Sequence, residues 1–189
     1  MADAPLILDL CGGTGSWSEP YRRDGYRVIT VDPLAEGEGA VRADVRVWEP
    51  PKGPVHGVLA APPCTHLAGS GARWWAGKGE EALLEGLSVV DACIRIVRAV
   101  RPAWWALENP VGRLTRYLGK PDLIFDPWEF GHPTKKRTCL WGDFTVPTRT
   151  PVEPTLGQVV WKLPPSPDRW RLRSITPAPV AEAFRRANP

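Results

Sequence analysis

The feature that most constrains the fold is a short apolar segment that runs directly into a glycine-rich turn. Residues 6–10 read Leu-Ile-Leu-Asp-Leu, and Cys-Gly-Gly-Thr-Gly follows at residues 11–15. A short apolar run that is closed by glycines is typical of a buried strand. Glycines in the turn let a ligand approach the backbone closely. The segment therefore predicts a strand, a ligand-binding turn and a helix in succession.

Strand-like and helix-like segments then alternate along the chain. The clearest helix lies between residues 80 and 101, where apolar side chains recur at spacings of three and four, and Pro102 ends it. This alternation predicts an α/β fold with a mostly parallel sheet, right-handed crossovers and helices on both faces. The expected order is a strand at 6–10, a helix to about 24–25, a strand at 26–31, a short strand near 41, a strand at 55–61, the helix at 80–101 and a strand at 104–107.

The C-terminal third has a different composition. From residue 121 onward the sequence is strand-like and rich in proline, residues 147–167 have the composition of a loop, and residues 179–188 favour a short closing helix. At 189 residues the chain is long enough for one substantial core and too short for two comfortable ones. We therefore expect one domain over 1–189, with its main core at 1–120 and a C-terminal part at 121–189.

The net charge and the spacing of the cysteines limit the kinds of partner and site that the chain can have. The net charge of +3 is compatible with an anionic partner, and the four cysteines form no Cys-x-x-Cys pair. We therefore expect neither a metal site nor a disulfide framework, and we place Cys93 and Cys139 in the core. The sequence shows no signal peptide and no long apolar run, which predicts a cytoplasmic protein without a membrane partner.

Acidic residues lie where the second and third strands end. Parallel sheets bind ligands at the carboxyl ends of their strands, so the glycine turn, Asp32 and Asp44 should share one edge. Asp32 could accept both ribose hydroxyls of a nucleoside, and Asp44 could accept a hydrogen bond from an adenine amino group. Ser18 stands where the dinucleotide fingerprint needs its third glycine. A nucleoside cofactor without a pyrophosphate, such as S-adenosylmethionine, fits this pattern; a tight turn with two solvated acids is the alternative.

A rigid cysteine follows the fourth strand. Pro62 and Pro63 fix two φ angles and remove two backbone donors immediately before Cys64. A thiol held in this way is placed as a nucleophile would be, and the alternative is a buried structural cysteine. Residues 108–110, Glu-Asn-Pro, end the neighbouring strand with a carboxylate, which favours catalysis. The Trp-Trp pair at 74–75 either belongs to the core or stacks on a base.

These motifs together resemble the cytosine-C5 DNA methyltransferases, and most of all the small phage-associated members of that superfamily. The resemblance covers residues 6 to about 178 in the family's motif order. It implies a Rossmann-like, S-adenosylmethionine-dependent methyltransferase fold whose cofactor-binding and catalytic parts lie within 1–120. It assigns the cofactor site to Asp9, Cys11, Gly12, Gly13, Gly15, Asp32, Asp44 and Pro62, with Cys11 where phenylalanine is usual.

The resemblance also implies how the reaction would run. Cys64 would add to C6 of cytosine and make C5 nucleophilic toward the methyl group, while Glu108 would hold N3 and the exocyclic amine. Residues 131–142 resemble the motif that carries two alternate arginines. Arg137 matches the second and would bind the base O2. Lys135 replaces the first and would help to hold the thiolate.

Two parts of the family pattern are missing. About 28 residues separate Gly142 from Arg171, too few for a separate target-recognition domain, and the motif that closes over the cofactor is not recognisable. We therefore expect a monomer acting on DNA with a short or relaxed sequence preference, or on single-stranded DNA. The alternatives are the same chemistry on a free cytidine or deoxycytidine nucleotide, or a non-catalytic module that binds S-adenosylmethionine or DNA. Cys64 and Glu108 argue against the module, because binding needs neither.

Overall fold

A computed structural model describes residues 4–159, 164, 166 and 168–189 of the chain. Within these residues, seven strands form one sheet in the order β3-β2-β1-β4-β5-β7-β6. The strands are β1 (Leu6–Leu10), β2 (Arg27–Val31), β3 (Ala40–Val41), β4 (Gly57–Ala60), β5 (Trp104–Pro110), β6 (Leu123–Phe125) and β7 (Thr138–Asp143). Strands β1 to β5 are parallel, whereas β7 runs antiparallel to both β5 and β6. The sheet is mostly parallel.

The helices connect the strands and cover them. The longest is α2 (Trp75–Val100), whose backbone is kinked at Gly79, where φ is 72°. The others are α1 (Glu19–Arg23), α3 (Thr115–Leu118), α5 (Arg169–Ser174), α6 (Ala178–Ala187) and the 3-10 helices η1 (Gly69–Trp74) and η2 (Pro127–Phe130). Among the helices described, none combines the length and apolarity that crossing a membrane requires.

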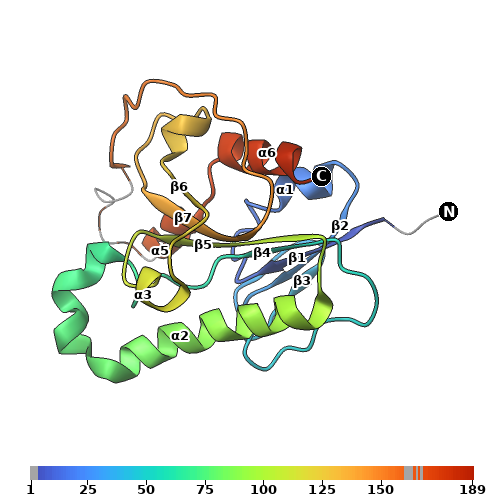
Figure 1. The fold of residues 1–189 in the computed structure, drawn as a ribbon, viewed down its shortest axis with the longest axis horizontal. Coiled ribbons are helices and arrows are strands. Elements are labelled where there is room, and N and C mark those ends of the chain that lie inside the picture. Colours follow the sequence, from blue (N-terminus) through green and yellow to red (C-terminus); the bar gives the residue numbers. More distant parts are fainter. Residues whose placement is uncertain (1–3, 160–163, 165, 167) are drawn as a thin grey trace.

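Apolar side chains are buried on both faces of the sheet. Successive residues of a strand point to opposite faces, so the apolar run of β1 supplies both. Leu8 packs with Cys93 and Ile96 of α2 on one face, and Ile7 packs with Phe184 of α6 on the other. Figure 1 shows α2 along one side of the sheet and α1 and α6 on the other. Helices therefore cover both faces, which confirms the fold class predicted from the sequence.

The predicted strands and the closing helix are confirmed, and two helices differ from expectation. The helix predicted at 80–101 begins earlier in the structure, at Trp75. The sequence did not indicate this first part, because residues 76–80 are exposed and show no apolar periodicity. The six-residue helix α5 was not predicted, since it is too short to show a periodic pattern. The loop predicted at 147–167 is irregular at 147–158, and its residues 160–163, 165 and 167 lie outside those described. Cys93 and Cys139 are fully buried, as expected.

Candidate active site

The carboxyl ends of β1, β2, β4 and β5 lie at one edge of the sheet, because these strands are parallel. The glycine turn follows β1, Asp32 follows β2, and Cys64 lies in the turn after β4. Glu108 lies in β5 beyond Leu107, which pairs with the last residue of β4. The structure therefore brings these groups to the same edge. No cluster of three or more His, Cys, Asp or Glu side chains able to hold a metal ion occurs in the described part of the chain.

The Asp9 side chain, in β1, forms a hydrogen bond with the segment that follows the glycine turn. Its carboxyl is buried and accepts a 2.5 Å hydrogen bond from the Ser18 hydroxyl. A Cβ on Gly12 would lie 2.5 Å from the same carboxyl, so only glycine fits at this position. Gly15 closes the turn by donating its N–H to the Gly12 carbonyl at 2.8 Å. Burial raises the pKa of Asp9 to about 6, against the opposing effects of the Ser18 hydrogen bond and the Arg22 charge.

The outer side of the same turn is open. Gly13 has a φ of 48°, and the one atom within 4 Å of a Cβ placed there would be Oδ2 of Asp32, at 3.9 Å. Oδ1 of Asp32 accepts a 2.8 Å hydrogen bond from the Leu34 backbone N–H, which fixes the carboxylate. A space bordered by glycine and a carboxylate oxygen can take a ribose whose hydroxyls donate to that oxygen. These residues fit the nucleoside part of S-adenosylmethionine.

Two residues expected at the cofactor site have partners within the protein. Both carboxylate oxygens of Asp44 accept hydrogen bonds from Arg46, which also pairs with Glu85 of α2. The hydrogen bonds from Arg46 lower the pKa of Asp44. Cys11 packs against the core under α2, where a hydrogen bond with Cys93 and burial raise the pKa of its thiol. The contacts of Asp44 with adenine and of Cys11 with the cofactor stay predictions.

The turn that carries Cys64 is anchored to β5. The carbonyl of the buried Pro62 accepts a 2.9 Å hydrogen bond from the side-chain amide of Asn109, which is fully buried. The carbonyl of Cys64 accepts the backbone N–H groups of residues 67 and 68, which closes the turn. Because Asn109 directly follows Glu108, this anchor fixes the position of the Cys64 turn relative to the Glu108 backbone.

The loop after β5 lies against the same turn. Arg113 donates its backbone N–H to the Leu67 carbonyl at 2.9 Å and its Nε to the His66 carbonyl at 2.7 Å. A Cβ on Gly112 would lie 2.1 Å from the Leu67 carbonyl oxygen. No side chain fits between the two loops at this point, and they form one braced unit.

The Cys64 thiol is half-buried, and its pKa lies above the ordinary value. Burial is the main cause, and the negative charge of Glu108 adds to it. The positive charges of Lys136 and Arg173 act in the opposite direction. Cys64 therefore carries its proton at neutral pH, and these two cations are the groups that favour its thiolate form.

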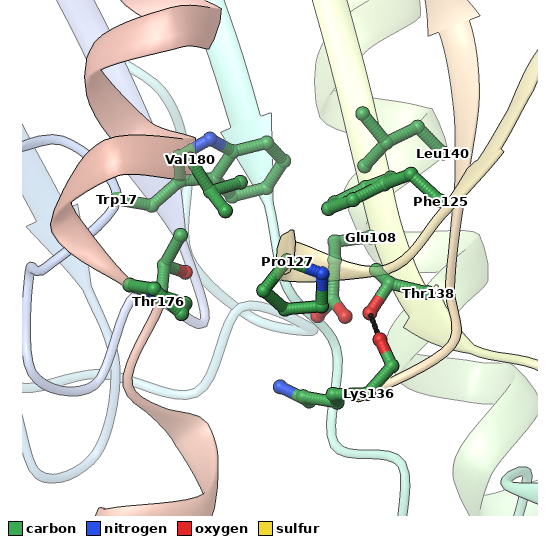
Figure 2. A pocket seen from close by; sticks show the side chains of 10 residues that line it. Trp17, Glu108, Phe125, Pro127, Lys136, Thr138, Leu140, Thr176 and Val180 are labelled. Carbon is green, nitrogen blue, oxygen red and sulfur yellow. Dashed lines mark hydrogen bonds between the residues drawn. The ribbon is translucent and has the colours of Figure 1, made fainter. Parts of the chain in front are cut away.

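A small pocket that is partly open to solvent lies beside Glu108. The Oε1 atom of Glu108 is buried and has no hydrogen-bond partner in the described part of the chain. Figure 2 shows Glu108 and Lys136 near Pro127, with the rings of Trp17 and Phe125 on the far side of the space. The lining residues are Trp17, Glu108, Phe125, Pro127, Lys136, Thr138, Leu140, Thr176, Pro177 and Val180. An apolar slot with a carboxyl oxygen that lacks a partner suits a flat ligand that carries N–H groups.

The cation at this pocket is Lys136, which reasoning from the sequence missed. Lys136 lines the pocket together with Leu140 of β7. The predicted Lys135 and Arg137 are both exposed, and Arg137 pairs instead with Asp126 at 3.8 Å. Successive side chains of an extended chain point to opposite sides, so Lys135 and Arg137 face away from the pocket that Lys136 lines. The sequence carried no signal that separates Lys136 from its neighbours, because β7 buries apolar side chains on both of its faces.

The comparisons with known proteins show the fold. No protein-family model and no curated protein sequence matches the chain. It is similar to a structure described as a DNA modification methyltransferase encoded within an E. coli prophage, with a TM-score of 0.53, 16% identity, and coverage of 86% of this chain and 49% of that one. A second structure, the Entamoeba histolytica methyltransferase EhMeth, has a TM-score of 0.49 and 13% identity. The match covers 87% of this chain and 61% of that one. The chain spans about half of the length of the first of these proteins and about three-fifths of the second. The likeness to the first, together with the order of the strands, shows a Rossmann-like α/β fold.

Proposed function

We propose that the protein transfers a methyl group from S-adenosylmethionine to C5 of cytosine in DNA, through a covalent bond between Cys64 and C6 of the base. The observation that carries this proposal is that Cys64, Glu108 and Lys136 gather at one edge of the sheet, beside the open glycine turn. A thiol, a carboxyl and a cation are the groups that this reaction requires. The prophage-encoded structure of the same fold, described as a DNA modification methyltransferase, supports the choice of reaction class.

Cys64 supplies the nucleophile. The bond between its sulfur and C6 forms as the thiol proton passes to the Glu108 carboxylate, directly or through water, and the electron pair of the C5–C6 double bond shifts toward C5 and N3. Burial and the Glu108 charge disfavour the thiolate in the protein alone. The thiol therefore loses its proton only when the base is in place, with Lys136 and Arg173 balancing the negative charge of the thiolate. Because the free protein holds a protonated thiol, Cys64 is protected from side reactions.

Glu108 and Lys136 hold the base. The carboxyl of Glu108 donates a proton to N3 as charge builds there, and accepts a hydrogen bond from the exocyclic amine. Its buried Oε1 without a partner supports this role, because a ligand N–H would satisfy it. Lys136 faces the base O2, the position that the sequence resemblance gave to Arg137.

The open side of the glycine turn holds the cofactor. Asp32 accepts the ribose hydroxyls, and Gly13 leaves the space in which the nucleoside lies. S-adenosylmethionine supplies an electrophilic methyl group when it is bound. After C5 has taken that group, the C5 proton is lost to solvent and the Cys64 sulfur leaves C6 as the C5–C6 double bond re-forms. The N3 proton returns to Glu108 and from there to Cys64, which restores the base and the thiol.

The proposal is tested by identifying the methylated product. The protein is incubated with isotope-labelled S-adenosylmethionine and cytosine-containing DNA or dCMP, and the product nucleosides are separated by mass spectrometry. We expect 5-methylcytosine in DNA from the wild-type protein and none from Cys64→Ser. Calorimetry should show that Cys64→Ser binds S-adenosylhomocysteine as the wild type does. Methylation at an exocyclic nitrogen, or turnover of dCMP alone, would refute the proposal.

A further inference from the structure

We infer that the DNA bound at this site is single-stranded, held between the exposed ring of Trp74 on one flank of Cys64 and the arginines of α5 on another. This inference rests on the proposed function, because it specifies the form of DNA that the same site takes. It is carried by two surfaces beside the Cys64 turn and by the course of the segment that follows β7.

Trp74 forms the first surface. It ends η1, the short helix that follows the Cys64 turn, and 58% of its side chain is exposed. The guanidinium of Arg73 lies 5.0 Å from the centre of the Trp74 ring. The neighbouring Trp75 is half-buried instead, with the Arg113 guanidinium 4.6 Å from its ring centre. Trp75 therefore belongs to the fold, whereas Trp74 offers an aromatic surface on which an unstacked base can lie, with a cation beside it for the phosphate.

Helix α5 forms the second surface. It lies next to the catalytic groups, because Nζ of Lys136 donates a 3.2 Å hydrogen bond to the Arg173 carbonyl and the Arg173 charge acts on the Cys64 thiol. Arg171 on the same helix is exposed, and its side chain makes no hydrogen bond or ion pair with any part of the chain that the structure describes. Arg169 and Arg173, four residues apart, share one face of α5, and Arg171 lies on another face, next to the groove-lining Leu172. Cations distributed around a short surface helix in this way suit a phosphate backbone.

A groove connects the Glu108 pocket with α5. It has a volume of about 250 Å³ and shares three lining residues with that pocket, Pro127, Lys136 and Pro177. Its other lining residues are His132, Thr134, Val159 and the exposed Leu172 and Ile175. Apolar walls beside arginines match the alternation of base and phosphate along a single strand, so the groove gives the strand a path from the pocket along α5.

The segment after β7 argues against a duplex. Reading a duplex requires an element that enters one of its grooves. Here the segment lies along η2 and the loop after it, where the backbone N–H groups of Thr150, Val152 and Leu156 donate to the carbonyls of Glu129, Trp128 and Pro133 at 2.9, 2.9 and 3.0 Å. Within residues 144–159 this leaves no projecting element. A single strand needs none, and it also avoids the few kcal/mol that extracting a base from a duplex costs.

Binding and methyl transfer measured on matched oligonucleotides test the inference. Fluorescence anisotropy with S-adenosylhomocysteine present compares one cytosine-containing sequence as single-stranded DNA, duplex DNA and single-stranded RNA. We expect single-stranded DNA to bind at least tenfold more tightly than the other two. Trp74→Ala should weaken this binding roughly five- to hundredfold, the range for the loss of one base–aromatic stack, and Trp74→Phe should retain most of it. Leu84→Ala on α2, where 57% of Leu84 is exposed, is the matched control and should bind as the wild type does.

The charge contribution is tested with a second pair of variants. Arg171→Gln should weaken binding of the single strand, whereas Arg98→Gln, an exposed arginine in the last turns of α2, should not. Equal or tighter binding of duplex DNA or RNA, or an unchanged affinity in Trp74→Ala, would overturn the inference. Methylation of C5 in duplex DNA with those binding results would overturn the inference and leave the proposed function in place. Binding that depends on Trp74 without C5 methylation of any substrate would overturn the reaction and leave the strand-binding surface.

Discussion

Acidic residues at the edge of the sheet divide by burial into two kinds. Asp9 is buried and directed into the fold, where it accepts the Ser18 hydroxyl and occupies the space beside Gly12. Asp32 and Glu108 each direct one oxygen away from internal partners, toward the glycine turn in one case and the pocket in the other. Residue type alone does not separate these roles, because the sequence shows Asp9, Asp32, Asp44 and Glu108 in or just after strands. The packing decides which of them a ligand can reach.

The burial of Asp9 predicts a pH-dependent stability. Its pKa is raised from 3.8 to about 6, so the folded state holds the proton more tightly and stability falls as pH rises from about 4 to about 6. Above that range the ionised carboxylate costs up to about 3 kcal/mol. Asp9→Asn carries no charge, so its stability relative to the wild type should rise by up to about that amount between pH 4 and pH 7.5. Denaturant unfolding at pH 4 and pH 7.5 measures the free energy of unfolding of the variant relative to the wild type, with the exposed Asp143→Asn as control. If the difference between Asp9→Asn and the wild type is the same at both pH values, the prediction is wrong.

The two acids assigned to the cofactor predict unequal effects on its binding. Asp32 has an oxygen directed at the open glycine turn, whereas both oxygens of Asp44 are held by Arg46. Asp32→Ala should therefore weaken the binding of S-adenosylhomocysteine by about 1–3 kcal/mol, the usual cost of losing a charged acceptor. Asp44→Ala should weaken it by less. Calorimetry of both variants makes the comparison, and a larger effect at Asp44 would place the nucleoside farther along the edge.

At the residue scale, the sequence led to Lys135 and Arg137 as the cations of the site, whereas Lys136 is the cation that lines the pocket. A motif match aligns residues by spacing, and three consecutive cations make that alignment ambiguous by one position. The packing of β7 resolves it, because Leu140 faces the pocket and residues an even number of positions away share its side. Asn109 belongs to the Glu-Asn-Pro segment at 108–110, which the sequence singles out. Its hydrogen bond to Pro62 depends on how β4 and β5 pair and could not be derived from one sequence.

At the scale of elements, the turn after β4 and the loop after β5 act as one unit. A Cβ on Gly112 would clash with the Leu67 carbonyl at 2.1 Å, and this oxygen is backbone that cannot swing aside. Gly112→Ala should therefore displace the Cys64 turn, lower stability by about 1–3 kcal/mol and reduce methyl transfer while binding of S-adenosylhomocysteine changes little. Gly77→Ala in α2 is the control, because a Cβ there meets nothing within 4 Å. Equal stability and turnover in the two variants would show that the loops move independently.

Elements were predictable where local pattern and burial coincide. The strands β1, β2, β4 and β5 are short apolar runs with turn residues at their ends, and α2 shows helical periodicity over its buried half. The antiparallel insertion of β7 between β5 and β6 leaves no local signature, since it arises from pairing between distant segments. Helix α5 gives no helical signal, because its arginines at every second position follow the period of a strand.

At the scale of the whole molecule, the sheet and its covering helices place the glycine turn, the Cys64 thiol and the arginines of α5 along one edge. The net charge of +3 is small, and the distribution matters more than the total. Arg73 and Arg171 are exposed beside the Cys64 turn and the groove, whereas several other arginines are paired, such as Arg23 with Glu182 and Arg46 with Asp44. Exposed arginines also lie elsewhere, such as Arg98 on α2, so it is the position of Arg73 and Arg171 that suggests a polyanion at this edge.

This distribution predicts a steep salt dependence of DNA binding. A protein that holds a single strand releases counterions, and its affinity falls with a log–log slope of about −0.7 for each phosphate neutralised. If three or four cations at this edge engage phosphates, a rise from 50 to 200 mM salt should weaken binding roughly twenty- to fiftyfold. dCMP carries one phosphate group and should lose only about threefold on the same slope. Anisotropy titrations across this range measure both, with Arg171→Gln expected to reduce the slope by about 0.7 and Arg98→Gln to leave it unchanged. A slope for the oligonucleotide as shallow as that for dCMP would mean that the edge holds a nucleotide and not a strand.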